Sequence, residues 1–394
     1  MRVLQLCAHL DMVGGVESYL RRLVTGLDGR GHASLVLGGA GSAESWPSGG
    51  AGVGLVPGCQ WFGAPEEATD QVLDLAEEFR PDVVHVHEVE NFGLVQRLAA
   101  RWPTLKHAHV DFTCAAGGRR YFRRSRRACS RVLGPLCLWH YYAGPCGPAR
   151  SPLRALAGYR RARKAFSVWR GVRRVIANSE HLRQGLKRAG LRPETTEVLH
   201  YFVPAAGKSG EKSPDGGEVL FVGRIVPGKG LEDLLRALAR METPARLTVV
   251  GDGFARRGAE RAAGELGLAR RVEFASWQDD VEPFYRRASV LVVPSLWPEP
   301  FGIVGIEAMA RALPVVAYRS GGIPEWLEDG RTGMLCEPGD INGLAESIDA
   351  VLSEPGAASR MGKAGQERQR RLFSPEPHLE RLEEIYREVV DTHG

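Results

Sequence analysis

The chain alternates between short apolar runs and amphipathic stretches, and it does so in two separate blocks. In the first block, runs of strand length at residues 3–6, 34–37, 82–87, 105–110, 175–178 and 198–200 alternate with helical stretches such as 17–27, 67–79 and 91–101. Parallel neighbours need a crossover connection, so strands separated by helices favour a parallel sheet. This pattern predicts a doubly wound α/β domain over residues 1–203, with residues 38–64 irregular because they are rich in Gly and Pro.

A second block of the same kind covers residues 218–374, with strand-like runs at 219–222, 246–250, 272–274, 290–293, 314–317 and 334–336. Residues 204–217 between the blocks are polar and contain Gly, Ser and Pro, which predicts a linker. Ser374 and Pro375 begin a last helix at about 375–391. The expected fold class is therefore α/β with two Rossmann-like domains, a cleft between them, and ligands outside the carboxyl ends of the strands.

Length and hydropathy agree with this organisation. A chain of 394 residues fits two domains. It has no apolar run of about 18 residues, so we predict no membrane-spanning helix. The first residues lack the apolar region of a signal peptide, which favours a cytoplasmic protein with reduced thiols.

The charge is unevenly distributed. Residues 112–165 interrupt the strand–helix rhythm as a basic, Cys-containing insertion, and no Asp or Glu occurs from Phe112 to Ser179, where there are sixteen Arg or Lys. The basic segment 119–174 predicts an anionic partner: a membrane surface, a lipid phosphate or an acidic acceptor. This would place the protein peripherally at the inner membrane surface. The alternative is a solvated Arg-rich face, since only seven of the 52 basic residues are Lys.

Four cysteines, Cys114, Cys129, Cys137 and Cys146, lie in the insertion. They could stay free, bind a structural Zn²⁺ or form disulfides. No C-x(2–4)-C pair is present, and disulfides are disfavoured in the cytosol, so the three readings stay open. Nucleic acid is not an expected partner, because the sequence has no aromatic-interleaved nucleic-acid motif.

Cations and glycines follow several predicted strands. Arg224 and Lys229 share one loop before a helix, where two fixed charges could neutralise a diphosphate without a metal. Gly14 and Gly15 lie between a strand and a helix, so they suit either a phosphate or a plain tight turn. Gly253 ends another strand and could allow a ligand to approach the backbone, or could form a turn.

The segment from Pro294 to Glu307 carries the most specific chemistry. Glu299 stands in a Pro-rich loop, Phe301 and Gly302 lead into a helix, and Glu307 lies inside that helix. Amides at a helix start can bind hydroxyl or phosphate oxygens, and each carboxylate could accept a pair of hydrogen bonds from a sugar or a ribose. For Glu307 the alternative is a structural salt bridge within an apolar run.

This segment resembles the E-x(7)-E motif of the family 4 retaining glycosyltransferases, which have the GT-B fold. Further motifs of that family occur in the family order over nearly the whole chain: Gly14-Gly15-Val16-Glu17, Asp82–His87, Asn178-Ser179, Gly223-Arg224 with Lys229-Gly230, Gly251-Asp252-Gly253 and Gly321–Glu325. The resemblance implies transfer of a hexose-type sugar from a nucleotide sugar, UDP being favoured as the nucleotide, with retention of configuration. No metal or other cofactor is expected, because Arg224 and Lys229 take the place of a metal at the leaving phosphate. That phosphate accepts the acceptor's proton at the front face.

The resemblance also implies a role for each matching position. Gly15 would give an amide to the donor phosphate, and Arg224 and Lys229 would hold the diphosphate. Glu299, with the amides of Phe301, Gly302, Ile303 and Val304, would bind sugar hydroxyls, and His109 would contact the transferred sugar. Glu307 would bind the ribose. The base would lie near Gly253 and the end of strand 272–274. The family usually has Asp directly after that His, whereas Val110 intervenes here before Asp111.

Two other functions are compatible with the same fold. One is a catalytically silent nucleotide-sugar-binding protein, since fold alone does not establish activity. The other is a nucleotide-sugar epimerase or hydrolase, which would need a further acid–base pair on the first domain that the sequence does not offer. The acceptor is also open: a lipid phosphate predicts an exposed basic face on the insertion, and a small soluble acceptor predicts a lid.

Overall fold

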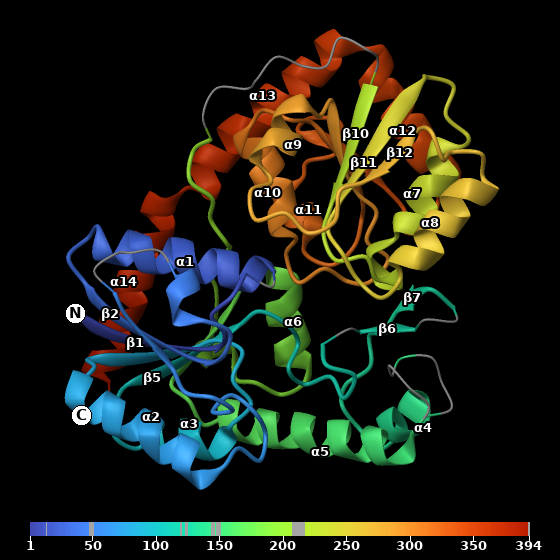
Figure 1. Ribbon diagram of the computed structural model, residues 1–394. Helices are drawn as coiled ribbons and strands as arrows, with labels where there is room; N and C mark the ends of the chain where they lie inside the picture. Colours follow the sequence, from blue (N-terminus) through green and yellow to red (C-terminus); the bar gives the residue numbers. More distant parts are fainter. Residues whose placement is uncertain are drawn as a thin grey trace. The chain divides into compact units, whose positions relative to one another are not determined.

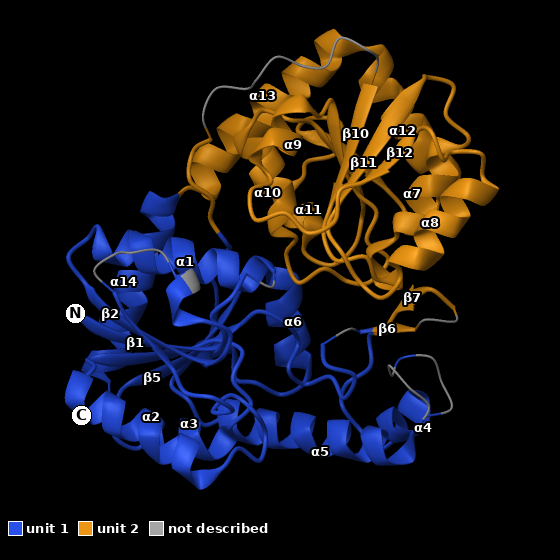
Figure 2. Ribbon diagram, in the orientation of Figure 1, with its two compact units in different colours: residues 1–120, 130–201, 375–394 blue, residues 121–129, 202–374 orange. Residues whose placement is uncertain are grey.

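The computed structural model describes residues 1–12, 14–46, 51–118, 120–122, 125–142, 146, 151–206 and 217–392. The chain divides into two compact units (Figure 2). Unit 1 contains residues 1–120, 130–201 and 375–394, and unit 2 contains residues 121–129 and 202–374. Most of the expected linker, residues 207–216, lies outside the described residues.

Unit 1 is built on a parallel sheet of order β3-β2-β1-β4-β5-β8-β9. Its strands are β1 (Arg2–His9), β2 (Ala33–Ala40), β3 (Gly52–Leu55), β4 (Val83–Val86), β5 (Thr104–Ala108), β8 (Arg174–Ala177) and β9 (Thr196–Val198). The strand order reverses between β1 and β4, because β2 and β3 add on one side of β1 and the later strands add on the other. This is the doubly wound topology that the alternating sequence predicts.

Helices cover both faces of this sheet, with α1 and α14 on one face and α2, α3 and α5 on the other (Figure 1). The helices of unit 1 are α1 (Gly15–Asp28), α2 (Glu66–Phe79), α3 (Phe92–Ala99), α4 (Leu136–Tyr142), α5 (Pro152–Trp169), α6 (Glu180–Arg188) and α14 (Pro375–Asp391), with short 3-10 turns at Ala43–Ser45 and Pro193–Thr195. Buried aliphatic side chains of the strands and of α2, α3, α5 and α6 form one continuous core. No helix among the residues described is long and apolar enough to cross a bilayer.

Residues 38–64 contain more regular structure than expected. β2 continues to Ala40, and Gly52–Leu55 forms the edge strand β3, which pairs in parallel with β2. The expectation of irregular structure was wrong here because glycine has a low strand propensity. A Cβ at Gly54 would lie 2.8 Å from a methyl carbon of Leu37, so the close packing of the two strands favours glycine at this edge position.

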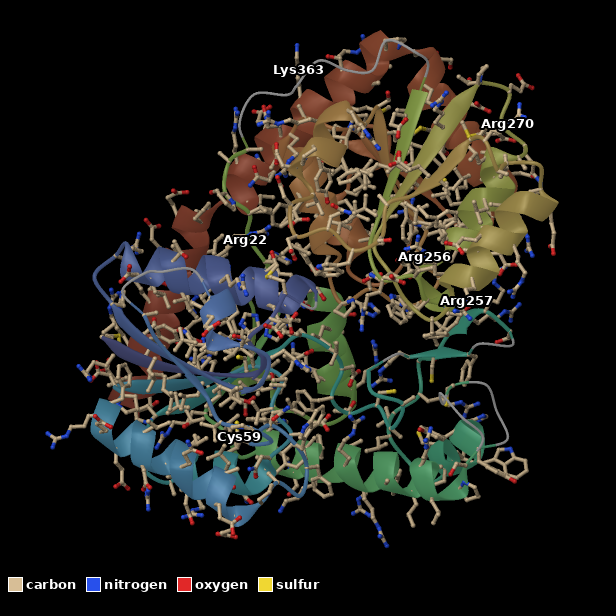
Figure 3. All side chains as sticks on the ribbon, in the orientation of Figure 1. Arg22, Cys59, Arg256, Arg257, Arg270 and Lys363 are labelled. Atoms are coloured by element: carbon tan, nitrogen blue, oxygen red, sulfur yellow. The ribbon has the colours of Figure 1, made fainter. Side chains whose placement is uncertain are left out.

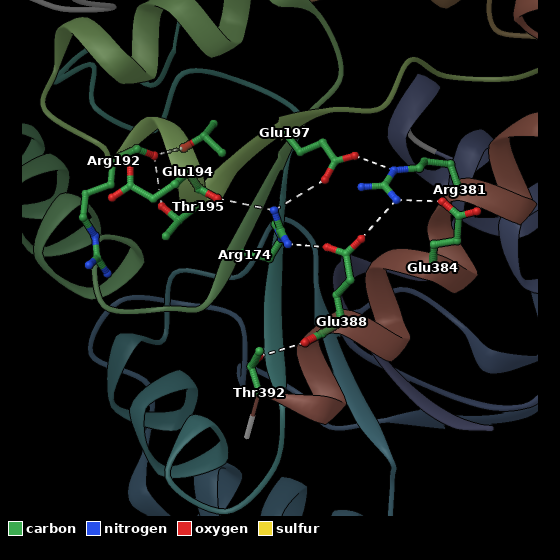
Figure 4. A network of polar contacts seen from close by, with 10 residues as sticks. Arg174, Arg192, Glu194, Thr195, Glu197, Arg381, Glu384, Glu388 and Thr392 are labelled. Carbon is green, nitrogen blue, oxygen red and sulfur yellow. Dashed lines mark hydrogen bonds and ion pairs between the residues drawn. The ribbon is translucent and has the colours of Figure 1, made fainter. Parts of the chain in front are cut away.

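Helix α14 is fixed to unit 1 by both apolar and ionic contacts. Its inner face buries Leu382, Ile385 and Tyr386, as expected for an amphipathic helix on a sheet. At one edge, Figure 4 shows a network in which Arg381 Nε donates to Glu197 at 2.6 Å and Glu388 bridges Arg381 and Arg174. The last helix is therefore part of the first unit, although unit 2 precedes it in the chain.

The contact between α14 and the sheet can be tested at Tyr386. Its hydroxyl lies 2.8 Å from His85 Nδ1, and both side chains are fully buried. Tyr386→Phe leaves a buried ring nitrogen without that partner, so we expect the free energy of unfolding to fall by roughly 1–3 kcal/mol. Urea denaturation measures this. Tyr142→Phe, the same change at an exposed tyrosine, is the matched control and should cost nothing measurable; equal effects of the two changes would contradict the assignment.

Unit 2 is built on a parallel sheet of order β12-β11-β10-β13-β14-β15. Its strands are β10 (Gly217–Val222), β11 (Ala245–Val250), β12 (Val272–Phe274), β13 (Val290–Val293), β14 (Val315–Tyr318) and β15 (Gly333–Cys336). Its helices are α7 (Leu231–Leu238), α8 (Arg256–Glu265), α9 (Glu282–Arg287), α10 (Ile303–Ala310), α11 (Ile323–Trp326), α12 (Ile341–Ser353) and α13 (Pro355–Leu372), with a 3-10 turn at Pro227–Lys229. The strand order reverses between β10 and β13.

One segment of the basic insertion belongs to unit 2. Residues 121–129 contain the antiparallel pair β6 (Tyr121–Phe122) and β7 (Arg127–Ala128), and they group with residues 202–374. Tyr121 is buried in the core of unit 2, and Arg126 forms an ion pair with the fully buried Asp233 of α7. We expected the whole insertion in the first domain; the hairpin differs because these two side chains have their partners in the second.

Candidate functional site

The predicted donor residues of unit 2 lie at the point where its strand order reverses. The loop after β10 carries Arg224 and Lys229, and the loop after β13 carries Glu299. β10 and β13 are parallel neighbours, so their carboxyl ends meet at the same edge of the sheet. Ligands of open α/β sheets bind at this kind of edge. The structure therefore brings together residues that are 70 positions apart in the chain.

The carboxylate of Glu299 is held by three donors. Lys229 Nζ, Ser295 Oγ and Trp297 Nε1 donate to its Oε1 at 2.7, 2.6 and 2.8 Å. Glu299 is 4% exposed, and Oε2 has no hydrogen-bond partner among the residues that the structure describes. Three contacts on one oxygen fix the carboxylate's orientation and leave the second oxygen available to accept from a ligand hydroxyl.

The charge of Glu299 is matched to this environment. Burial alone would raise the pKa of its carboxyl, but the Lys229 ammonium and the hydrogen bonds from Ser295 and Trp297 outweigh burial and hold the pKa below its ordinary value. Lys229 is also placed 5.5 Å from the centre of the Trp297 ring. Glu299 is therefore an ionised acceptor at neutral pH.

Arg224 has a different environment from Lys229. It is exposed, and no described residue forms an ion pair or a side-chain hydrogen bond with its guanidinium. Lys229 keeps 21% of its side chain exposed while it is bonded to Glu299. An ammonium has three donors, so Lys229 can hold Glu299 and an anion together. The loop thus presents one free and one half-buried cation at the strand end.

Helix α10 begins directly after the Glu299 loop. Its N-cap is Gly302, which has φ = 91°, and the amides of its first turn come from Ile303 and Val304. Phe301 is fully buried, and its carbonyl accepts from Trp326 Nε1 at 2.7 Å, which fixes where the helix starts. Amides at a helix N-terminus favour anions and hydroxyl oxygens.

Glu307 lies on α10 and is buried. The hydroxyl of Tyr285 donates to its Oε2 at 3.1 Å, and Arg311 Nη1 donates to its backbone carbonyl at 2.6 Å. The Tyr285 hydroxyl is therefore one partner of the carboxylate. Tyr285, like Ser295 and Trp297 beside Glu299, is a residue that the sequence analysis missed.

Two glycines of the predicted motifs are explained by backbone packing. A Cβ at Gly253 would lie 2.3 Å from the carbonyl oxygen of Ile225, so the loop after β11 packs directly on the loop that carries Arg224. Gly321 has φ = 62°, and a Cβ there would lie 2.1 Å from the carbonyl oxygen of Glu299. Both glycines hold neighbouring loops against the donor residues, and the structure brings Gly253 to the same edge of the sheet.

The predicted residues of unit 1 lie at the corresponding edge of their own sheet. Gly15 is the first residue of α1, in the connection that follows β1 at the reversal of strand order. His109 follows β5, and the Tyr19 ring of α1 lies 5.8 Å from its ring. Asn178 Nδ2 donates to the His109 carbonyl at 3.2 Å, and Ser179 caps α6 by accepting from an amide. The Asn178-Ser179 motif therefore stabilises this edge.

His109 is part of a buried ladder of imidazole rings. His87 Nδ1 lies 2.9 Å from His109 Nε2, and the Tyr201 hydroxyl lies 2.6 Å from His109 Nδ1, so both nitrogens of His109 are occupied. The rings of His107 and His109 stack at 4.5 Å. Burial, followed by the neighbouring His and Lys side chains, lowers the pKa of His85, His87, His107 and His109 well below the usual value. The ladder is therefore neutral at physiological pH.

Three rungs of this ladder also have the composition of a metal site. Nitrogens of His85, His87 and His107 lie within 4.8 Å of one another. Zinc needs Zn–N bonds of about 2.0–2.1 Å, with lone pairs that converge on one point. The His85 and His107 rings differ by only 12° in orientation, and both nitrogens of His87 are hydrogen-bonded. The buried Lys106 also donates to the His87 carbonyl. Nε2 of His85 and Nε2 of His107 have no hydrogen-bond partner among the described residues, but His87 has no nitrogen left for a third ligand, and we assign no metal to this group.

The cysteines do not gather in the same way. None of the seven is in a disulfide in the structure, and Cys129 belongs to unit 2 whereas Cys114, Cys137 and Cys146 belong to unit 1. Among the described residues the histidines form the single cluster of metal-ligand type. The structure therefore does not pair the cysteines of the insertion in disulfides, and among the described residues they form no group of metal-ligand type.

A pocket of unit 2 lies away from these residues. It is lined at the amino ends of β10, β11 and β12 by polar side chains that include Glu218, Arg246, Arg270 and Arg287. The predicted donor residues are at the opposite, carboxyl edge. Because the strands are parallel and the motifs follow them, we place the candidate site at the carboxyl edge.

Comparison with known proteins decides the family. Residues 14–201 match the model of the "Glycosyl transferase 4-like domain", and residues 205–368 match that of "Glycosyl transferases group 1". The chain belongs to the GT4-like group 1 glycosyltransferases. The two family segments follow the division into two units, with the donor residues in the second segment.

Relatives of known name agree with this assignment. The lipopolysaccharide core biosynthesis glycosyltransferase LpsE of Rhizobium meliloti is 32% identical over 51% of this chain and 60% of its own length. The D-inositol 3-phosphate glycosyltransferase of Streptomyces scabiei is 34% identical over 50% of each chain. The matches thus span about half the length of the curated relatives. Anabaena Alr3699/HepE, solved in complex with UDP-glucose, has a TM-score of 0.75 at 23% identity, covering 98% of this chain and all of its own. The fold of this glycosyltransferase is GT-B.

The pair Lys229–Glu299 of this glycosyltransferase gives a pH-dependent prediction. In the wild type the lowered pKa of Glu299 adds stability above the ordinary pKa of a glutamate, and this stability is lost as the pH falls through the folded value. In Lys229→Met the buried carboxylate loses its cation, its pKa rises, and its ionised form destabilises the unit. We expect the free energy of unfolding to drop by roughly 1–3 kcal/mol at about pH 7, and by less near pH 4.5.

Urea unfolding at both pH values measures this difference. Lys363→Met, at an exposed lysine of α13, is the matched control and should leave the free energy of unfolding unchanged. A loss that is the same at both pH values would mean that the cation does not act through the Glu299 carboxylate.

Proposed function

We propose that this protein is a retaining glycosyltransferase that moves a hexose-type sugar from a UDP-sugar to an acceptor, without a metal or another cofactor. The observation that carries the proposal is the arrangement at the carboxyl ends of β10 and β13. There an oriented, ionised Glu299 with an open Oε2 stands beside Lys229 and the exposed Arg224. Such a set pairs a sugar-hydroxyl acceptor with two phosphate-binding cations.

Each residue of unit 2 has a role in this proposal. Arg224 and Lys229 bind the diphosphate and stabilise the negative charge that develops as the sugar–phosphate bond breaks. Glu299, with the amides at the start of α10, accepts and donates hydrogen bonds to the sugar hydroxyls. Glu307, oriented by Tyr285, accepts from the ribose hydroxyls. Gly253 lies at the loop beside which the base would bind.

The chemistry needs no protein nucleophile in this proposal. The acceptor hydroxyl attacks from the face that the diphosphate leaves, its proton passes to the leaving phosphate oxygen, and the configuration is retained. The two fixed cations stabilise the charge of the leaving diphosphate, which is the role of a divalent ion in other phosphate-transfer sites.

Unit 1 contributes Gly15 and His109 and binds the acceptor. The amide of Gly15, in the first turn of α1, contacts the donor phosphate. His109 contacts the transferred sugar after its bond with Tyr201 or His87 is exchanged for one with a sugar hydroxyl, because both of its nitrogens are occupied in the present structure. We propose that the protein acts in the cytoplasm, on an anionic or membrane-associated acceptor.

Relatives support the donor and the acceptor class. HepE was solved in complex with UDP-glucose, and a GT-B relative with this donor favours uridine here. Two relatives are named for lipopolysaccharide core biosynthesis and for D-inositol 3-phosphate, and both names point to acceptors with anionic groups. The basic insertion of this chain fits an acceptor of the same charge.

Nucleotide binding is the first test. Without added metal and with EDTA present, we expect UDP to raise the thermal unfolding midpoint, and GDP and ADP to have less effect. Arg224→Ala should weaken UDP binding by roughly tenfold to a hundredfold, since it removes charge-assisted hydrogen bonds to phosphate. Arg270→Ala, at an exposed arginine on the other edge of the sheet, is the matched control. A UDP effect that depends on divalent metal would contradict the cation roles.

Product stereochemistry is the second test. The anomeric configuration of the glycoside formed from UDP-α-glucose, read from its anomeric proton coupling by NMR, should be α. A β product would overturn the front-face mechanism. A further result is that UDP binds while the UDP-sugar is neither hydrolysed nor used for transfer to phosphorylated, lipid-linked or neutral acceptors. That result would favour a catalytically silent nucleotide-sugar-binding protein over a transferase.

A further inference from the structure

The insertion carries an unusual group of exposed apolar side chains. Six of the fourteen large hydrophobic residues that the described structure leaves exposed lie between residues 132 and 156. Trp139 is 65% exposed, Leu136 62% and Leu153 80%. Exposed apolar residues that gather in one place mark an interaction surface more often than a solvated one.

Helix α4 has one exposed apolar side and one side that packs against α5. Leu136, Trp139 and Tyr142 recur every three residues and form one row, whereas Tyr141 packs with Ala155 of α5 on the other side. α4 and α5 contact each other (Figure 1), and α5 exposes Leu153 and Leu156 near its start. We call these five residues, Leu136, Trp139, Tyr142, Leu153 and Leu156, the α4–α5 apolar face.

Cations continue the exposed side of α5 beyond the apolar residues. Arg160, Arg163, Lys164 and Arg170 are exposed and recur at helical spacing with Leu153 and Leu156. None of the four forms an ion pair with a residue that the structure describes, whereas Arg161 on the same helix pairs with Glu90. We call these four residues the α5 basic face. It belongs to a stretch of sixteen basic residues without a single acid.

We propose that the α4–α5 apolar face and the α5 basic face together dock unit 1 on the surface of an anionic phospholipid bilayer. Trp and Leu side chains enter the boundary between headgroups and acyl chains, while Arg and Lys bind the anionic headgroups. Both helices lie on the surface, and neither crosses it. The proposal names a docking surface and does not depend on the donor site.

Other occupants account for fewer of these observations. A second copy of the chain would bring two faces of the same strong positive charge together, which opposes association. A nucleic acid would account for the arginines but not for the aliphatic Leu136 and Leu153. A bilayer with anionic lipids accounts for both the apolar and the basic residues.

Vesicle flotation tests the proposal with the full-length protein. We expect it to bind vesicles of phosphatidylcholine with about a third phosphatidylglycerol, not to bind phosphatidylcholine alone, and to be released at about 0.5 M salt. Two variants separate the contributions. The apolar variant is Leu136→Ser, Trp139→Ser and Leu153→Ser, and the charge variant is Arg160→Glu, Arg163→Glu and Lys164→Glu. Each should lower the partition coefficient at least tenfold.

Control variants carry changes of the same kind on unit 2. Exposed cations that Figure 3 labels provide the charge control, and exposed leucines provide the apolar control: Arg257→Glu, Arg270→Glu and Lys363→Glu, and Leu266→Ser with Leu372→Ser. Both should bind vesicles as the wild type does. All variants are first checked by circular dichroism and by stabilisation with UDP, so a failed donor site and a failed docking surface give different results.

Three outcomes would overturn the proposal. One is a wild type that stays unbound with anionic vesicles. Another is binding that the two variants leave unchanged. The third is a wild-type dimer, seen by light scattering, that the apolar variant dissociates while vesicle binding is absent; this would assign the face to a second copy of the chain.

Discussion

The buried carboxylate of Glu299 is the contact on which the candidate site depends. An ionised group that is almost fully removed from water must be compensated by donors, and here they come from Lys229, Ser295 and Trp297 on two loops. The loops after β10 and β13 are therefore fixed relative to each other before any ligand arrives. This preorganisation is the form of electrostatic stabilisation that costs no rearrangement during a reaction.

The fold follows from the sequence wherever a strand is apolar throughout. Residues such as Val83–Val86 and Val290–Val293 are buried on both faces of a parallel sheet, so their hydropathy alone identifies them as strands. β3 could not be recognised, because Gly52 and Gly54 have no strand propensity of their own and pair only in the context of β2. The hairpin at 121–129 was missed for a related reason: the partners of Tyr121 and Arg126 are far away in the chain.

The site shows the same division. Charged residues at strand ends could be identified from the sequence, because a carboxylate or guanidinium that follows a strand is placed where ligands of α/β sheets bind. The importance of Ser295, Trp297 and Tyr285 arises only from the fold, when the loop after β13 brings the first two to Glu299 and helix α9 brings Tyr285 to Glu307. Ser295 and Trp297 could have been found from their positions in the sequence, since both lie within four residues of Glu299 in the same loop.

The two units use their polar residues in opposite ways. In unit 2 an ionised pair at the sheet edge keeps one oxygen open, whereas in unit 1 burial keeps the histidine ladder neutral and its His109 rung fully hydrogen-bonded. A neutral ladder whose His109 rung is held at both nitrogens is suited to positioning, and a charged pair with a spare acceptor is suited to binding. Unit 1 also carries positive charge on the exposed side of α5, where Arg160 and Arg163 have no described ion-pair partner. Exposed charge without a described ion-pair partner can attract an anionic surface, which is the physical reason to place this side of α5 at such a surface.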